Sequence, residues 1–212
     1  MILHLVEEEK FLSKAILLFE DAFPGKNVFL VGASGKELDF KIASGQKTRI
    51  VYEKTGTKAY KNAFSTYVIK AELLFFHNLY RTYKLDLYPL IPADKKITFF
   101  LWGAELYGLC NEIDNLLPLT KQIYFGELSY LIYLRKQLFG KFKRDYYWRK
   151  FKKLLNNKVD FVLTNIAEDI SLLNQYAPNS AKQGWFTYFS MGADWQQLQG
   201  TGIKKNILIG NS

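Results

Sequence analysis

Apolar positions along the chain form short runs that alternate with stretches of helical spacing. Short apolar runs bounded by polar residues, glycine or proline predict buried strands, whereas apolar residues three and four positions apart predict amphipathic helices. Strands are expected at residues 2–6, 27–32, 48–52, 72–77, 97–102, 160–164, 183–188 and 206–210. Helices are expected at residues 10–22, 59–70, 104–116, 119–157 and 167–176, the fourth with a break near Gly140.

This alternation of strands and helices predicts an α/β fold. The expected strands are apolar on both faces, which is typical of a parallel sheet covered by helices on each side. We therefore expect a Rossmann-like parallel sheet with helices on both faces. Ligands of such folds bind outside the carboxyl ends of the strands. The segments that follow the expected strands are residues 6–9, 32–35, 77–80, 103–107, 164–165 and 211–212.

The last part of the chain predicts a domain boundary. Residues 196–205 are polar and contain glycine, as interdomain linkers do. Residues 206–212 (NILIGNS) then begin another strand of buried type. We expect one domain over residues 1–195, and over residues 196–212 a linker and the first strand of a second, truncated domain.

Positive charge is concentrated in one segment, residues 135–158. This segment holds ten of the 29 Lys and Arg residues and one of the 20 Asp and Glu residues, so the rest of the chain, with 19 of each sign, is neutral. Aromatic residues lie among the cations. Such a segment suits a partner that is negatively charged and has an apolar layer, and the interface of an anionic membrane has both properties.

A helical projection of this segment separates its apolar and basic residues. The apolar arc holds Tyr147, Trp148, Phe151, Leu154 and Leu155, and cations occupy the opposite side. Three interpretations stay open: a helix packed on the sheet with a solvated basic face, a membrane-surface helix, and a nucleic-acid-binding helix. For the membrane interpretation the candidate lipid-phosphate residues are Lys143, Arg144, Trp148, Arg149, Lys150, Lys152 and Lys153.

Composition excludes several classes of protein. A single cysteine, Cys110, rules out an internal disulfide and fits a reducing compartment. With two histidines and one cysteine, a zinc site is not expected, and we expect no metal and no other cofactor. No apolar run approaches the roughly 18–20 residues of a membrane span. We therefore expect a cytoplasmic protein whose membrane contact is peripheral.

Two strand-end constellations are candidate binding sites. In the first, Trp102 ends a strand, Gly103 permits a tight turn, and Glu105 lies in the first turn of a helix, where it either accepts a proton from a hydroxyl or merely stabilises the helix start. In the second, His77 follows a strand and either hydrogen-bonds a sugar or phosphate or is structural. His4 lies inside a strand and is interpreted as structural.

Familiar nucleotide-binding motifs are not matched. The stretch from Gly32 to Lys36 (GASGK) lacks the phosphate-loop spacing, because Glu37 stands where a Ser or Thr is required. We interpret this stretch as a turn, with a place in the lining of the cleft as the alternative. No G-x-G-x-x-G follows the first strand, so a dinucleotide site is not expected.

Four blocks of the chain, in order, resemble one family. They are residues 75–78 (FFHN), 102–109 (WGAELYGL), 161–173 (FVLTNIAEDISLL) with the following 185–188, and 207–212 (ILIGNS). Together they resemble the N-terminal half of glycosyltransferase family 56, the N-acetylfucosamine transferases, also described as 4-α-L-fucosyltransferase-like. The resemblance ends where the second half of such an enzyme begins.

The resemblance implies a two-domain GT-B architecture, with an N-terminal acceptor-side domain and a C-terminal donor-binding domain. The implied reaction moves N-acetylfucosamine or fucose from a dTDP- or GDP-linked sugar to a saccharide carried on polyprenyl pyrophosphate. The implied location is the cytoplasmic face of the cell membrane, in cell envelope polysaccharide biosynthesis, with no metal and no nucleic acid. We expect this stretch alone to be inactive, because the donor half is missing.

Site residues follow from the matched blocks and from the strand ends. The matched positions are His77, Trp102, Gly103, Glu105, Tyr107, Asn211 and Ser212. Glu105 would be the catalytic base or hydroxyl-orienting group, at a position where the family often has Asp. Trp102 and Tyr107 would stack on sugar or shape the pocket. The strand ends add the candidate substrate-binding residues Asn78, Thr164 and Asn165.

Overall fold

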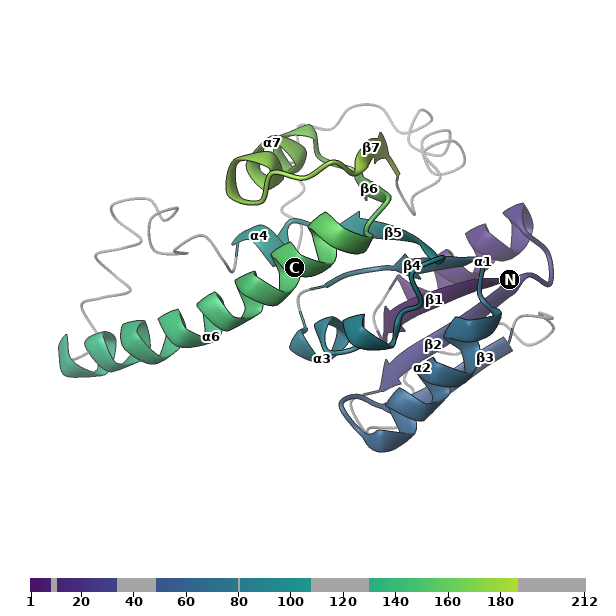
Figure 1. The fold of residues 1–212 in the computed structure, drawn as a ribbon, viewed down its shortest axis with the longest axis horizontal. Coiled ribbons are helices and arrows are strands. Elements are labelled where there is room, and N and C mark those ends of the chain that lie inside the picture. Colours follow the sequence, from purple (N-terminus) through teal and green to yellow (C-terminus); the bar gives the residue numbers. More distant parts are fainter. Residues whose placement is uncertain (9–10, 34–48, 80, 108–129, 187–212) are drawn as a thin grey trace, which may run out of the picture.

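The structure is a computed structural model that describes residues 1–8, 11–33, 49–79, 81–107 and 130–186. In these ranges strands and helices alternate (Figure 1). The strands are β1 (Ile2–Glu7), β2 (Asn27–Ala33), β3 (Arg49–Lys54), β4 (Leu73–Phe76), β5 (Lys96–Leu101), β6 (Phe161–Thr164) and β7 (Lys182–Trp185). The helices are α1 (Leu12–Ala22), α2 (Lys58–Lys70), α3 (Thr82–Leu85), α4 (Ala104–Tyr107), α6 (Tyr130–Lys158) and α7 (Ala167–Tyr176), with a 3₁₀ turn at Tyr88–Leu90.

The described strands form one parallel sheet in the order β3-β2-β1-β4-β5-β6-β7. The expectation of a Rossmann-like parallel sheet is confirmed. The chain leaves β1 toward β2 and β3, then returns to place β4 on the other side of β1. The strand order therefore reverses between β1 and β4, and ligands of open α/β sheets bind at such a reversal, beyond the carboxyl ends of the strands.

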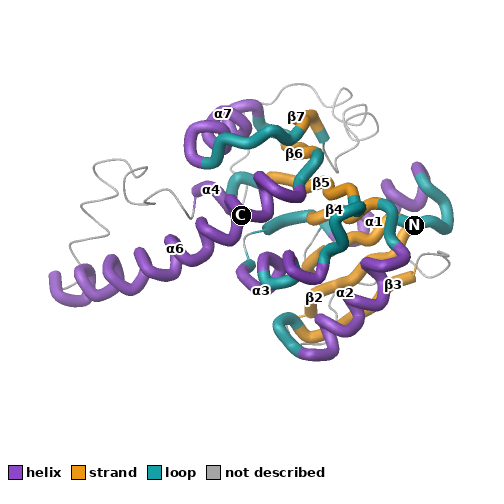
Figure 2. The backbone as a smooth tube through the Cα atoms, viewed as in Figure 1, coloured by secondary structure: helices purple, strands orange, loops and turns teal. Residues whose placement is uncertain are grey.

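Each face of the sheet buries its own apolar cluster. On one face, α1 covers alternate residues of β1, β2, β4 and β5, with Ile16 and Phe19 packed against Phe29 and Phe75. On the other face lie α2, α3, α6 and α7. Figure 2 shows α2, α3 and α6 in front of the sheet and α1 behind it. The two clusters together confirm helices on both faces.

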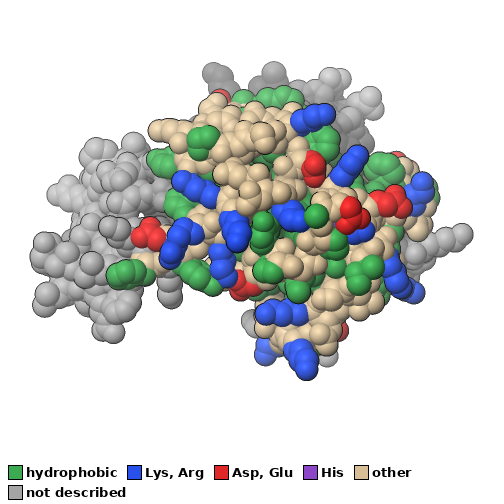
Figure 3. Space-filling view, in the orientation of Figure 1, with side chains coloured by type: hydrophobic (Ala, Val, Ile, Leu, Met, Phe, Trp, Pro, Cys, Tyr) green, Lys and Arg blue, Asp and Glu red, His purple; other side chains and the backbone are tan. Residues whose placement is uncertain are grey.

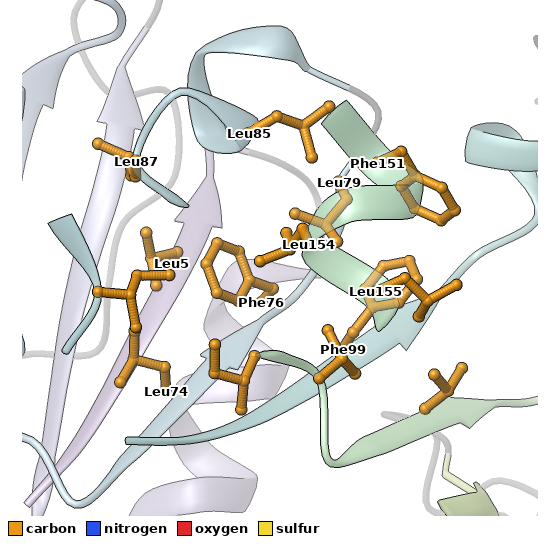
Figure 4. Close-up of a cluster of buried hydrophobic side chains, with 14 of the residues drawn as sticks. Leu5, Leu74, Phe76, Leu79, Leu85, Leu87, Phe99, Phe151, Leu154 and Leu155 are labelled. Atoms are coloured by element: carbon orange, nitrogen blue, oxygen red, sulfur yellow. The ribbon is translucent and has the colours of Figure 1, made fainter. Parts of the chain in front are cut away.

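Helix α6 is held to the sheet by the apolar arc that its sequence predicts. Tyr147, Phe151, Leu154 and Leu155 are buried, and Trp148 is half-buried. Figure 4 shows Phe151, Leu154 and Leu155 beside Phe76 and Phe99 of the sheet. These rings are thus part of the core, while Phe142 and Tyr146 on the same helix are 73% and 47% exposed.

The structure corrects several expected boundaries. Helix α6 continues through Gly140, so the expected break there is wrong. A glycine inside a helix costs about 1 kcal/mol relative to alanine, which a long helix with a packed apolar face can absorb. Gly32 and Ala33 belong to β2 and are not a turn. Strand β7 is displaced from the expected residues 183–188.

Other expectations fall partly or wholly outside the described residues. These are the strand at 206–210, residues 119–129 of the helix expected at 119–157, and the continuation of the 104–116 helix beyond Tyr107. The boundary between residues 195 and 196 lies there as well and stays a prediction. Among the helices that the structure describes, none has the length and apolarity needed to cross a membrane.

Candidate functional site

A hollow opens where β1, β4 and β5 end against α1, beside the strand-order reversal. Its lining combines aliphatic and aromatic side chains with one carboxylate and one imidazole. The lining residues are Val6, Glu7, Phe11, Leu12, Ala15, His77 and Trp102. The space, including its open mouth, is about 250 Å³. A cleft is expected at the strand ends near His77, Trp102–Glu105 and Thr164–Asn165, and of these residues the structure brings His77 and Trp102 together in the hollow.

Trp102 lines the hollow and is held by one hydrogen bond and two ring contacts. Its indole N–H donates to the backbone oxygen of His77 at 2.7 Å. Its ring stacks on Phe11, with ring centroids 5.4 Å apart, and meets the edge of Phe100. Gly103, which follows, has a φ of 86°. This left-handed conformation favours glycine, and it confirms the tight turn expected after Trp102.

Glu7 supplies the carboxylate of the hollow and is held by α3. The Tyr83 hydroxyl donates to Glu7 Oε1 at 3.1 Å, and the Lys84 ammonium lies 3.5 Å from the same oxygen. Arg81 Nε lies 3.9 Å from Oε2. Gly32 makes room for this arrangement, because a Cβ at that position would stand 2.5 Å from the Tyr83 hydroxyl.

Lys84 is a buried cation beneath the strand ends. Its side chain has no solvent exposure. Its ammonium donates to Asn78 Oδ1 at 2.7 Å and to the Asn78 backbone oxygen at 3.3 Å. Because a buried charge is costly unless it is paired and hydrogen-bonded, Lys84, Glu7 and Asn78 form one interdependent group. Asn78 is 2% exposed and holds this lysine, and its predicted role in substrate binding stays a prediction.

His77 is joined to His4 inside the sheet. Their nearest ring nitrogens are 3.0 Å apart, and the second ring nitrogen of His4 lies 3.1 Å from Asn27 Oδ1. Burial lowers the pKa of His4 to about 3. Burial, the neighbouring His4 and the Lys84 charge together lower the pKa of His77 well below its ordinary value. Both rings are therefore neutral at neutral pH.

Glu105 points into the protein and does not line the hollow. Its side chain is 1% exposed, and its carboxylate accepts the backbone N–H groups of Leu79 at 3.0 Å and Trp102 at 3.3 Å. Burial raises its pKa to about 7, against the opposing effect of these hydrogen bonds. This geometry ties the end of β5 to the segment after β4. The catalytic role assigned to Glu105 from sequence stays a prediction, and the contacts favour positioning.

The remaining predicted site residues do not meet in the hollow. Thr164 is buried at the end of β6, and its hydroxyl oxygen accepts the Ile166 N–H, while Asn165 beside it is exposed. The side chain of Tyr107, and Asn211 and Ser212, lie outside what the structure describes. The substrate-binding roles of Thr164 and Asn165 stay predictions. They would require a ligand that extends from the hollow to the end of β6.

The basic helix presents part of its charge to solvent. Arg149, Lys152 and Lys153 are exposed, and Lys150 forms an ion pair with Asp86, just after α3. Figure 3 shows Lys and Arg side chains over the C-terminal half of α6. Nothing is described of the side chains of Lys143 and Arg144. Trp148 packs against Phe151 and Tyr176, so this candidate lipid contact is partly core.

Sequence reasoning did not single out Glu7, Phe11, Lys84 or Asn27. Glu7 stands directly after an apolar strand, within the strand-end segment 6–9, and that position is the signal that points to it. Lys84 and Asn27 carry no such signal, because lysine and asparagine side chains are usually solvated.

Comparisons with known proteins support the fold. No family model matches the chain, and no curated protein sequence matches it. Among solved structures, a sucrose-phosphate synthase from Thermosynechococcus elongatus is similar with a TM-score of 0.50 and 11% identity, over 93% of this chain and 97% of that one. Os79 from O. sativa, in complex with UDP, is similar with a TM-score of 0.47 and 10% identity, over 85% of this chain and 51% of that one. The chain thus shares the Rossmann-like fold of the synthase structure.

Proposed function

We propose that the chain is the acceptor-side domain of a GT-B glycosyltransferase. The observation that carries this proposal is the hollow at the reversal between β1 and β4, where Trp102 and Phe11 flank Glu7 and His77. Aromatic rings pack against the C–H faces of sugars, while carboxylate and imidazole acceptors bind their hydroxyl groups. The similarity of the fold to a sucrose-phosphate synthase structure supports the same class.

In this proposal Glu7 has the role of general base. An acceptor hydroxyl bound in the hollow would attack the anomeric carbon of a nucleotide-sugar. A new C–O bond forms, the bond between that carbon and the nucleotide phosphate breaks, and the hydroxyl proton passes to the Glu7 carboxylate. Lys84 and Tyr83 hold the carboxylate in place. Glu105 supports the wall by fixing the backbone of Trp102.

The finer proposal concerns donor and acceptor. The blocks that resemble family 56 support a fucose-type sugar, either fucose or N-acetylfucosamine, carried on dTDP or GDP. They also support a polyprenyl-pyrophosphate-linked saccharide as acceptor. The exposed cations Arg149, Lys152 and Lys153 of α6 support contact with an anionic membrane surface, where such an acceptor would be held at the cytoplasmic face.

The test is sugar transfer by the chain together with any coding sequence that continues past Ser212. It should transfer a fucose-type sugar to a lipid-linked saccharide. Glu7→Gln should lower kcat by about 10²–10⁴-fold, the usual contribution of a general base. The control is Glu53→Gln, on the outer strand β3, which should leave kcat unchanged. Unaltered kcat in the Glu7 variant would exclude this residue as the general base.

RNA binding without vesicle binding or sugar transfer would instead support a basic nucleic-acid-binding domain.

A further inference from the structure

Helix α6 runs against the direction of the strands, and its first half extends past the sheet (Figure 1). Near the end of the helix, the Lys158 ammonium donates to the backbone oxygens of Ile91 and Pro92, which precede β5. Further toward its start, the Tyr147 hydroxyl donates to the backbone oxygen of Leu79, which follows β4. The residues before Tyr147 therefore lie beyond the carboxyl edge of the sheet, the edge at which the hollow opens.

Two aromatic rings stand on this extending part of the helix. Phe142 is 73% exposed and Tyr146 is 47% exposed. Because they are four residues apart, their side chains are neighbours on one face of the helix. With a rise of 1.5 Å per residue, Phe142 lies about 7 Å further along the helix axis than Tyr147, which marks the edge of the sheet.

The rings and two cations form one outer stripe. Its residues follow one another at steps of four, three and four, the spacing of one side of a helix. They are Phe142, Tyr146, Arg149 and Lys153. The buried Phe151, in the arc packed on the sheet, is about 180° from Phe142 at 100° per residue. The outer stripe thus faces away from the core, with its rings at the projecting end and its cations nearer the sheet.

The charge around the outer stripe is mostly positive. Arg149, Lys152 and Lys153 are exposed, while Lys150 is paired with Asp86. Asp145 is the single acidic residue in the sequence of this helix. A partner must therefore be negatively charged and must also accept aromatic rings. The interface of an anionic bilayer meets both conditions, because its phosphates lie directly above an apolar layer.

A bilayer suits the outer stripe better than a nucleic acid does. Proteins that bind single strands stack the bases on open ring faces along a positively charged groove. The outer stripe is instead the convex side of a helix, and the Lys150 ammonium lies over the Tyr146 ring, 4.4 Å from its centroid. Phe142 has no group that could hydrogen-bond a base edge or a phosphate.

We propose that Phe142 and Tyr146 insert into the interface of an anionic lipid bilayer, while the exposed cations of α6 bind lipid phosphates beside them. This anchor lies beyond the same edge of the sheet as the hollow. The inference rests on the proposed function and deepens it, since it states which part of α6 enters the membrane. Trp148 packs against Phe151 and Tyr176 and is not part of the anchor. Part of the binding energy is then apolar and is not screened by salt.

The first experiment removes the rings without changing the net charge. Phe142→Ser together with Tyr146→Ser should weaken flotation with vesicles of phosphatidylcholine and phosphatidylglycerol by about tenfold or more, as expected for the partial burial of two rings. The control is Leu17→Ser with Phe23→Ser, which removes side chains 50% and 44% exposed on and just after α1. It should leave vesicle binding unchanged. Equal binding by the ring variant and the wild-type chain would overturn the proposal.

The second experiment locates the anchor along the helix. The chain has one cysteine, so a nitroxide can be attached in a Cys110→Ser background through Phe142→Cys or Asn156→Cys. Asn156 is exposed, uncharged and near the other end of the helix. With vesicles bound, the label at 142 should collide with oxygen more than with a water-soluble nickel complex, and the label at 156 should do the reverse. A label at 142 that stays in water, or equal depths at both positions, would overturn the placement of the anchor.

These readouts need no sugar transfer, so the two proposals can fail separately. Sugar transfer by a chain that does not bind vesicles would overturn the anchor and leave transferase activity in place. Insertion of Phe142 in a protein without transferase activity would overturn the proposed function alone. If the ring variant loses RNA binding while vesicle binding is unchanged, the outer stripe is a nucleic-acid surface and the anchor is overturned.

Discussion

The ammonium nitrogen of Lys84 lies 3.5 Å from Glu7 Oε1, with the lysine side chain fully buried and the glutamate 13% exposed. The two residues come from α3 and from the end of β1, which the chain separates widely but the sheet brings together. Lys84→Met should therefore destabilise the fold by about 3–5 kcal/mol, because it leaves Glu7 without its buried partner. Urea unfolding at pH 7 measures this loss.

A double-mutant cycle separates the pair from simple packing. Glu7→Gln in the Lys84→Met background should recover part of the lost stability, since no uncompensated carboxylate remains. Additive effects of the two substitutions would show that Lys84 acts independently of Glu7.

The buried histidines predict acid-sensitive stability. Burial lowers the pKa of His4 from 6.5 to about 3 and also lowers that of His77. The unfolded chain therefore binds protons below pH 6.5 that the folded chain does not, and stability is lost as pH falls. Each histidine contributes up to about 1.4 kcal/mol per pH unit. His4→Phe, which keeps the stacking on Phe29, should remove about half of the histidine-dependent slope between pH 6 and 4.5.

Glu105 predicts a pH dependence of stability opposite to that of the histidines. Burial raises its pKa from 4.5 to about 7. Between these two pH values the folded chain retains a proton that the unfolded chain releases. The contribution of Glu105 to the free energy of unfolding is therefore fully present below pH 4.5 and is lost as pH rises through about 7. The loss is about 3 kcal/mol at most. Against Glu105→Gln, the wild-type chain should have a larger stability advantage at pH 5 than at pH 8. An advantage that is constant with pH would mean that Glu105 does not titrate in this range.

The outer face of α6 predicts salt-sensitive membrane binding. Replacing Arg149, Lys152 and Lys153 together by alanine should weaken binding to vesicles rich in anionic lipid by about a hundredfold. The matched control removes the same number of exposed cations from α2, at Lys58, Lys61 and Lys70. Equal losses in both variants would show that only net charge matters. Binding to neutral vesicles should be weak in every case.

Sequence patterns identified much of the fold because apolar periodicity reports burial. The seven described strands and the inward arc of α6 follow from residues such as Phe29, Phe99 and Phe151, whose environment is apolar and non-specific. The helix break predicted at Gly140 was wrong because the cost of a glycine inside a helix is smaller than the stability that tertiary packing of the helix provides. The short helix α3 was missed, since one turn leaves no periodicity to read.

Only part of the candidate site could be predicted from the sequence. His77 and Trp102 follow strands, and the fold class alone places strand ends together. Lys84 and Asn27 depend instead on side chains that meet across long sequence separations. Their partners, Glu7 and His4, have no fixed spacing from them in the chain. For Glu105 the sequence pointed to a site residue that the structure buries. Its position just after a strand predicted a carboxylate that faces the cleft, whereas its hydrogen bonds with Leu79 and Trp102 turn it into the protein.

The position of β1 between β2 and β4 has a consequence for biosynthesis. Both strands that pair with it, β2 and β4, follow it in the chain. A ribosome that has made Ile2–Glu7 must continue through Leu73–Phe76 before this strand can have its second neighbour. Until then one edge of a strand that is almost entirely buried in the folded sheet stays open to chaperones or to other nascent chains. Slower translation before β4 should therefore lower the yield of folded protein more than slower translation after it.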